Sequence, residues 1–225
     1  MARGFFVTGT DTGVGKTTIA CALLHAFAAT GKSVVGMKPV AAGREQGRWA
    51  DVQALAHAST VQAPGKLVNP YAFEPAVAPH IAAELAGVEI DIEAIARAYG
   101  ELSRMAEVVV VESAGGFMVP LNARQTGADL AKRLGLPVLL VIGMRLGCLN
   151  HALLTRRLIE AYGLHCAGWV ANCVLPQMPY LDDNIRALEQ RLACPLLGRV
   201  PFRQDLDPKQ IASLLSAAAL MEAAE

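Results

Sequence analysis

A single stretch near the beginning organises this chain: Phe5-Phe6-Val7-Thr8-Gly9-Thr10-Asp11-Thr12-Gly13-Val14-Gly15-Lys16-Thr17-Thr18. Its apolar start, Phe5 to Val7, is typical of a strand that enters a core. A glycine-rich loop follows, and the residues from Ile19 to Leu24 continue as a helix. This order of strand, loop and helix predicts a phosphate-binding loop, because glycines allow backbone N–H groups to approach phosphate oxygens.

Two side chains at the end of the loop fit this prediction. Lys16 can reach the β- and γ-phosphates of a nucleotide, and Thr17 can offer its hydroxyl to Mg²⁺. The N-terminus of the following helix adds its dipole. The alternative, a glycine-rich turn that binds nothing, is disfavoured because a strand and a helix both lie in the right places.

The loop departs from the standard spacing. Five residues rather than four separate Gly9 from Gly15, so the pattern G-x-x-x-x-G-K-[ST] fails by one. The segment from Gly13 to Thr18 instead resembles the loop of the nitrogenase iron protein and of chromosome-partitioning ATPases. Those proteins carry a second lysine early in the loop, where this chain has Asp11.

Composition limits the possible classes of protein. The chain has 225 residues, of which 53% are hydrophobic and only 5% aromatic, and its formal net charge is zero. We therefore expect one domain over residues 1–225, with no nucleic-acid or membrane partner held by bulk charge. We also expect no signal peptide to be removed, and a cytoplasmic protein with reduced thiols at its five cysteines: Cys21, Cys148, Cys166, Cys173 and Cys194.

Two further apolar runs end in charged residues. The run from Ser33 ends at Lys38, before Pro39, and the run from Glu107 ends at Glu112. Ligands of open α/β sheets bind at the carboxyl ends of strands. Glu112 could hold Mg²⁺ beside the phosphate loop, or it could pair with Lys16 or a helix terminus. Lys38 could equally be a solvated residue at a strand end.

Asp51 begins another predicted helix, which continues to Ala56. Its most common role there would be a helix cap, and a Mg²⁺ or nucleotide contact is the alternative. Further strands are predicted at 136–142, 166–172 and 195–200, and further helices at 79–86, 91–105, 126–131, from Asn150 onward, and at 208–224. Strands that alternate with helices predict an α/β fold with one doubly wound, mostly parallel sheet of six or seven strands and helices on both faces.

Several motifs carry a family resemblance over nearly the whole chain. They are Gly9 to Thr17, Lys38-Pro39-Val40, Val68-Asn69-Pro70-Tyr71, Pro79-His80, Val111 to Gly116, Gly147-Cys148-Leu149-Asn150-His151 and Gly168-Trp169-Val170-Ala171-Asn172. The set resembles the dethiobiotin synthetases. The resemblance implies a Mg²⁺-dependent enzyme that joins 7,8-diaminononanoate and CO₂ at the expense of ATP, through a carbamate and a carbamic-phosphoric anhydride. It also implies a homodimer with the substrate site at the subunit interface.

The resemblance implies a role for each matching residue. The catalytic residues would be Lys38, Lys16 and Thr12. The Mg²⁺ ligands would be Thr17, Asp51 and Glu112. The nucleotide site would include Gly13, Val14, Gly15, Lys16, Thr17, Thr18, Asp51, Glu112, Ser113, Ala114, Gly115, Asn172, Cys173, Pro201, Phe202 and Arg203. The diamine would contact Lys38, Ala42, Gly147, Cys148 and Asn150, with Asn150 as the first residue of a helix or its N-cap.

Three departures from the family pattern accompany the resemblance. Gly13 stands where a glutamate is common, and Ala42 where a serine often contacts substrate. The segment after Pro201 matches poorly, so it gives no ribose-binding acid. The choice among ATP, CTP and GTP stays open.

Other enzyme and binding classes fit less well. An amide ligase of the cobyrinic-acid or CTP-synthase type would need a glutamine-hydrolysing domain, for which 225 residues leave no room. A partitioning-type switch ATPase would carry the early loop lysine. A GTPase would carry N-K-x-D, and Asn172-Cys173-Val174-Leu175 does not match it.

Overall fold

The computed structural model describes residues 3–44, 46–203 and 207–216. Its centre is a six-stranded sheet in the order β2-β5-β1-β6-β7-β8, in which all neighbouring strands are parallel. The strands are β1 (Arg3–Gly9), β2 (Val34–Met37), β5 (Val108–Glu112), β6 (Val138–Met144), β7 (Cys166–Cys173) and β8 (Leu196–Val200). The predicted α/β fold and the parallel sheet are confirmed.

The central position of β1 in the sheet determines where a ligand site can form. β1 pairs with β5 on one side and with β6 on the other, so the loops after these three strands meet at one edge. The chain runs outward in one direction from β1 to β2 and in the other from β6 to β8. Such a reversal opens a crevice at the carboxyl ends of the strands, where α/β proteins bind ligands.

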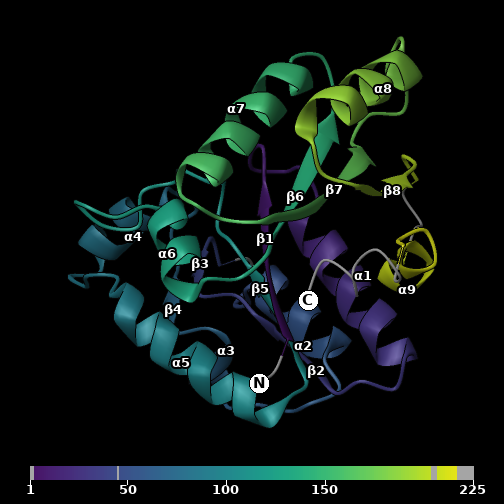
Figure 1. Cartoon of the computed structure of the whole chain (residues 1–225). Coiled ribbons are helices and arrows are strands. Elements are labelled where there is room, and N and C mark those ends of the chain that lie inside the picture. Colours follow the sequence, from purple (N-terminus) through teal and green to yellow (C-terminus); the bar gives the residue numbers. More distant parts are fainter. Residues whose placement is uncertain (1–2, 45, 204–206, 217–225) are drawn as a thin grey trace.

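Helices cover both faces of the sheet, as Figure 1 shows. α1 (Lys16–Ala29), α2 (Ala50–Ala58) and α9 (Pro208–Ala212) pack on one face, against Phe5, Val7 and Val110. The helices of the other face are α5 (Ile92–Met105), α6 (Gly127–Leu134), α7 (Cys148–Ala161) and α8 (Leu181–Leu192). Because successive side chains of a strand point to opposite faces, both layers of the core come from the same strands.

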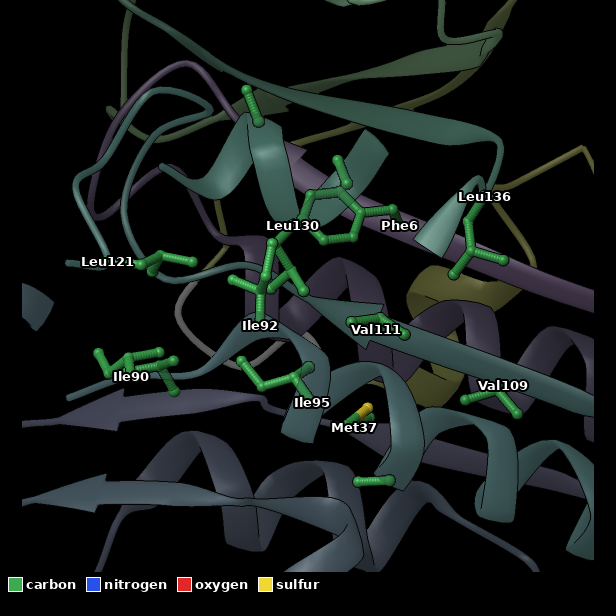
Figure 2. Close-up of a cluster of buried hydrophobic side chains, with 14 of the residues drawn as sticks. Phe6, Met37, Ile90, Ile92, Ile95, Val109, Val111, Leu121, Leu130 and Leu136 are labelled. Carbon is green, nitrogen blue, oxygen red and sulfur yellow. The ribbon is translucent and has the colours of Figure 1, made fainter. Parts of the chain in front are cut away.

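Figure 2 shows the larger apolar cluster of the second face. Phe6 of β1 and Val111 of β5 point toward Ile92 and Ile95 of α5 and Leu130 of α6. All of these side chains are buried. Burial of a large aliphatic side chain contributes about 1.5–3 kcal/mol, so this layer holds β1 and β5 firmly in place beneath the crevice.

A second, small parallel sheet lies beside the crevice. It pairs β3 (Val40–Ala42) with β4 (Tyr71–Phe73), and the short helices α3 (Gly65–Val68) and α4 (Pro79–Leu85) flank β4 in sequence. The indole N–H of Trp49 donates to the carbonyl of Phe73 at 2.9 Å, and the guanidinium of Arg44 lies 5.1 Å from the centre of the indole ring. These contacts fix the position at which α2 begins.

Several predicted helix ends differ from the structure. α7 begins at Cys148 rather than Asn150, because Gly147 adopts a left-handed conformation with φ of 92° and occupies the N-cap position. Asp51 is not a cap, since α2 begins at Ala50 after Trp49. The last helix ends at Ala212, and the predicted continuation to Ala224 lies partly outside the described residues.

In the part of the chain that the structure describes, no helix is both long enough and apolar enough to span a bilayer.

Candidate active site

The phosphate-binding loop connects β1 to α1 and is held from the end of β7. Gly13 and Gly15 have positive φ values of 74° and 88°. The side-chain amide of Asn172 donates to the carbonyl of Val14 at 2.8 Å. A Cβ atom on Gly15 would lie 2.2 Å from that amide nitrogen, so a side chain there would push Asn172 away.

A cluster of charged side chains lies directly beneath the loop. The ammonium of Lys38 is 2.6 Å from Glu112 Oε1 and 2.8 Å from Asp51 Oδ2. The hydroxyl of Thr17 donates to Glu112 Oε1 at 2.8 Å. The ends of β2, β5, α1 and α2 therefore bring together Lys38, Glu112, Thr17 and Asp51, the four residues to which the resemblance gave catalytic and Mg²⁺-binding roles.

Burial and charge set the pKa values of this cluster. Burial alone would lower the pKa of Lys38, but Glu112 and Asp51 outweigh it and the pKa is raised. Burial raises the pKa of Glu112, and Lys38 opposes that shift. Burial raises the pKa of Asp51 as well, but the charge of Lys38 and its hydrogen bond lower it by more, so the pKa of Asp51 is lowered. The raised pKa keeps Lys38 a charged ammonium at neutral pH.

Lys16 differs from Lys38 in its surroundings. Burial, followed by the charge of Lys38, lowers the pKa of Lys16 to about 8. Its ammonium donates to the backbone carbonyl of Asp11 at 2.7 Å and is not paired with a carboxylate at hydrogen-bond distance among the described residues. Lys16 is therefore the cation whose charge an incoming anion would stabilise most.

The donor set fits a hard divalent cation. Thr17, Asp51 and Glu112 offer one hydroxyl and two carboxylates, which are oxygen ligands that Mg²⁺ prefers. Glu112 Oε2 is buried and has no hydrogen-bond partner among the described residues, so one carboxylate oxygen is available. The described residues hold no group of three His, Cys, Asp or Glu that could bind a metal alone. A metal here would need phosphate and water oxygens as well.

Arg145 is a site residue that the sequence did not reveal. It follows β6, and its guanidinium donates to the carboxylate of Asp11 in the phosphate-binding loop. The one available signal was Asp11 itself, a carboxylate in the position of a lysine in similar loops. This pair joins the phosphate-binding loop to the start of α7.

The loop after β5 lies against the phosphate-binding loop. The hydroxyl of Ser113 donates to that of Thr8 at 3.2 Å, and both side chains are buried. Gly115 has a φ of 59°, and a Cβ atom there would lie 3.8 Å from the hydroxyl of Thr12. The structure thus brings Thr12, Ser113 and Gly115 together, with Ala114 between the last two.

The predicted base-binding residues gather at the ends of β7 and β8. Asn172 pairs in register with Val200, immediately before Pro201. Burial raises the pKa of the Cys173 thiol, and a hydrogen bond from the backbone of Phe202 opposes that shift. Pro201, Phe202 and Arg203 are exposed beside these strand ends. The segment predicted to flank the base therefore lies next to Asn172 and Cys173.

The predicted substrate residues fall on separate elements. Ala42 shares a cavity of about 220 Å³ with Trp49 and Asp51, close to Lys38. Gly147 and Asn150 are exposed at the start of α7. The Cys148 side chain is buried in the core, so only its backbone is available to a ligand.

Comparisons with known proteins identify the family. A family described as an AAA domain matches residues 3–210. The chain is 58% identical to the ATP-dependent dethiobiotin synthetase BioD of Nitrosospira multiformis, over 97% of this chain and 96% of that protein. It is 52% identical to the enzyme of the same name from Aromatoleum aromaticum, over 95% of this chain and 96% of that protein.

More distant solved structures share the fold. The MinD cell division protein of Aquifex aeolicus superposes with a TM-score of 0.63 at 18% identity, over 98% of both chains. MinD of Pyrococcus horikoshii, complexed with Mg-ADP, gives a TM-score of 0.59 at 15% identity, over 99% of this chain and 90% of that one. Identity to the BioD proteins over nearly their full length decides the family: this chain is a member of the ATP-dependent dethiobiotin synthetases.

Proposed function

We propose that the chain forms dethiobiotin from 7,8-diaminononanoate, CO₂ and ATP at the edge where β1, β2 and β5 end. One amine of the diamine captures CO₂ as a carbamate. A carbamate oxygen takes the γ-phosphoryl group and ADP leaves. The second amine then attacks the mixed anhydride, the cyclic urea closes and phosphate departs. The observation that carries the proposal is the buried Lys38 ammonium beside the phosphate-binding loop.

The charges of the site suit this reaction. A carbamate and three phosphates concentrate negative charge in a small volume, and Lys16 and Lys38 place two ammonium groups there. Because these groups are fixed before the reaction, they stabilise developing charge without reorganisation. Lys38 belongs at the carbamate, since it pairs with Asp51, which lines the cavity that also contains Ala42, and does not lie within the loop.

Mg²⁺ would be held by Thr17, Asp51 and Glu112. When bound, it would offset negative charge on the β- and γ-phosphates of ATP. Asn172, Cys173 and the segment from Pro201 to Arg203 would surround the base. Phe202, with 37% of its surface exposed, offers an aromatic face for that purpose.

We further propose a homodimer in which the start of α7 serves the partner's site. The first amides of a helix have no intrahelical acceptor, and with the helix dipole they can seat a carboxylate. The substrate carboxylate lies at the far end of an aliphatic chain from the reacting amines. Leu146 and Leu154, 99% and 58% exposed, flank Asn150 and present an apolar surface that a second subunit could cover.

The proposed reaction is tested by measuring ADP release with Mg²⁺ and bicarbonate, with and without the diamine. Release that depends on the diamine, with dethiobiotin detected as product, is expected. A partitioning-type ATPase would release ADP at the same rate in both assays, and that result would overturn the proposal.

A further inference from the structure

Two cysteines meet at the sheet edge opposite the active site. Cys166 is the first residue of β7, and Cys194 lies between α8 and β8. Their sulfur atoms are 3.4 Å apart, although 28 positions separate them in sequence. The nucleotide-site residues of the same strand, Asn172 and Cys173, lie at its other end. Nothing in the proposed reaction uses this pair.

The local backbone brings Cys194 back onto β7. α8 ends at Leu192, and its C-cap Ala193 adopts a left-handed conformation with φ of 50° that favours glycine. The carbonyl of Pro195, the residue after Cys194, accepts a hydrogen bond from the amide of Trp169 at 3.0 Å. Cys194 is thereby held between the two apolar clusters that include Cys166 and Trp169. The contact of the sulfur atoms follows from this strand pairing.

The two thiols have different environments. Cys166 is 4% exposed, and its S–H donates to the sulfur of Cys194, which is only half-buried. The hydrogen bond from Cys166 and the nearby guanidinium of Arg156 lower the pKa of Cys194, whereas that hydrogen bond and burial raise the pKa of Cys166. The less buried of the two cysteines is therefore the one that ionises more easily.

Arg156 of α7 is fixed beside the pair. Its Nε donates to the carbonyl of Leu192 at 2.9 Å, while its Nη1 is buried and makes no hydrogen bond within the part of the chain that the structure describes. Nη1 lies 3.7 Å from Glu160, at the limit of an ion pair. A buried cationic N–H without an acceptor favours a negative charge nearby, and a thiolate at Cys194 would supply it.

We propose that Cys166 and Cys194 form a reversible thiol–disulfide site that reacts with peroxides. The Cys194 thiolate attacks one oxygen of hydrogen peroxide, the O–O bond breaks, and a sulfenic acid and hydroxide form. The Cys166 sulfur then attacks the Cys194 sulfur, its proton joins the leaving hydroxide, and water departs. In sum, two thiols and one peroxide give one disulfide and two waters, and a dithiol reductant restores the thiols.

The geometry favours a disulfide over a metal site. An S–S bond of about 2.05 Å requires the sulfur atoms, now 3.4 Å apart, to approach by roughly 1.3 Å. A structural metal would need further ligands, and no third His, Cys, Asp or Glu completes a metal-binding group in the described ranges. The bond would close a loop that includes all of β7 and α8.

The test is oxidation of the full-length protein with a small excess of hydrogen peroxide. Free thiols are counted under denaturing conditions and peptides are mapped by mass spectrometry. We expect the five free thiols to fall by two, with a Cys166–Cys194 peptide pair that a dithiol reductant releases. The melting temperature should rise by about 5–10 °C. Turnover of the diamine should be unchanged, because the pair is remote from Lys38.

Three variants separate the roles. Cys166→Ala should stop the reaction at a sulfenic acid on Cys194, which dimedone traps. Cys194→Ala should leave Cys166 unoxidised, and Cys21→Ala, the matched control, should still form the disulfide. If all five thiols of the wild type survive peroxide, or if the bridge joins other cysteines or two chains, the proposal is wrong. The wild-type experiment decides this even if a variant fails to fold.

Discussion

Lys38 is held between Glu112 and Asp51, and its replacement should separate chemistry from nucleotide binding. If Lys38 neutralises the carbamate, Lys38→Gln should reduce kcat by about 10²–10³-fold and change ATP affinity far less. Steady-state kinetics and a nucleotide titration measure the two effects. Equal losses in both would instead place Lys38 on the nucleotide.

The same substitution has a cost in stability. Glu112 is 1% exposed, so removal of Lys38 leaves a buried carboxylate without its cation. Breaking a buried ion pair on one side costs about 3–5 kcal/mol. The variant Lys38→Gln/Glu112→Gln removes both charges and should recover part of this loss, without recovering activity. Urea unfolding of the three proteins therefore shows whether lost turnover reflects lost folding.

Replacement of Lys16 should stabilise the folded protein, whereas replacement of Lys38 should destabilise it. Its pKa, lowered to about 8, means that folding opposes its charge. The penalty is fully present below pH 8 and disappears as pH rises toward the unfolded value of 10.5. Lys16→Met keeps the apolar stem and should abolish phosphoryl transfer, yet unfold at a higher urea concentration than wild type at pH 7. Without nucleotide or Mg²⁺, the difference should vanish near pH 10.5; a variant less stable than wild type at pH 7 would contradict this account.

The phosphate-binding loop offers a matched pair of glycine substitutions. Gly13 and Gly15 both have positive φ, so alanine is strained at either. A Cβ atom on Gly13 meets no atom within 4 Å, whereas one on Gly15 meets the Asn172 amide at 2.2 Å. We expect Gly15→Ala to weaken ATP binding about 100-fold or more, and Gly13→Ala to weaken it much less. Both variants strain the backbone, but only Gly15→Ala also loses the hydrogen bond from Asn172 to the loop, which costs roughly a further 1–3 kcal/mol. Calorimetric titration with ATP measures both, and similar losses would indicate that Asn172 does not support the loop.

The sequence predicted the elements that carry long apolar runs, and the residues at which these runs end. Lys38 and Glu112 could be placed at one edge because β2 and β5 stop there and both are parallel to β1. The contact between Lys38 and Asp51 was not predictable in the same way. The start of α2 depends on Trp49, whose indole bonds to Phe73 of β4, a partner distant in sequence.

Long-range geometry also explains the other misses. The start of α7 is set by the left-handed Gly147, which sequence periodicity cannot distinguish from a loop glycine. Arg145 belongs to the site only because the β6–α7 loop reaches Asp11, and nothing in its local sequence indicates that partner. Local propensity predicts where elements exist, whereas tertiary contacts decide where they begin.

The proposed assembly can be tested by mixing two inactive proteins. One carries Lys38→Gln. The other carries Asn150→Asp, which adds a negative charge in the first turn of α7, where it suits the helix but repels a substrate carboxylate. A proline at Cys148 would be a poorer choice, because Cys148 is the first residue of α7 and proline is tolerated there. Mixed dimers should recover part of the wild-type activity, since some sites then combine two intact halves.

Subunit exchange needs its own control. Differently tagged wild-type chains, purified on one tag and probed for the other, establish that exchange takes place under the assay conditions. With exchange established, mixtures that stay inactive at every ratio would favour a site built within one chain.

The two tryptophans give the molecule a pair of optical probes. Trp169 is fully buried on β7 and its indole N–H has no hydrogen-bond partner in residues 3–44, 46–203 and 207–216, so its emission should be blue-shifted and insensitive to ligands. Trp49 lies at the start of α2, beside Asp51 and beneath Arg44, where emission responds to nearby charge. With excitation at the red edge of the absorption band, the emission of Trp49 would therefore report the binding of Mg²⁺ and nucleotide. The emission of Trp169 would provide a constant internal reference in the same spectrum.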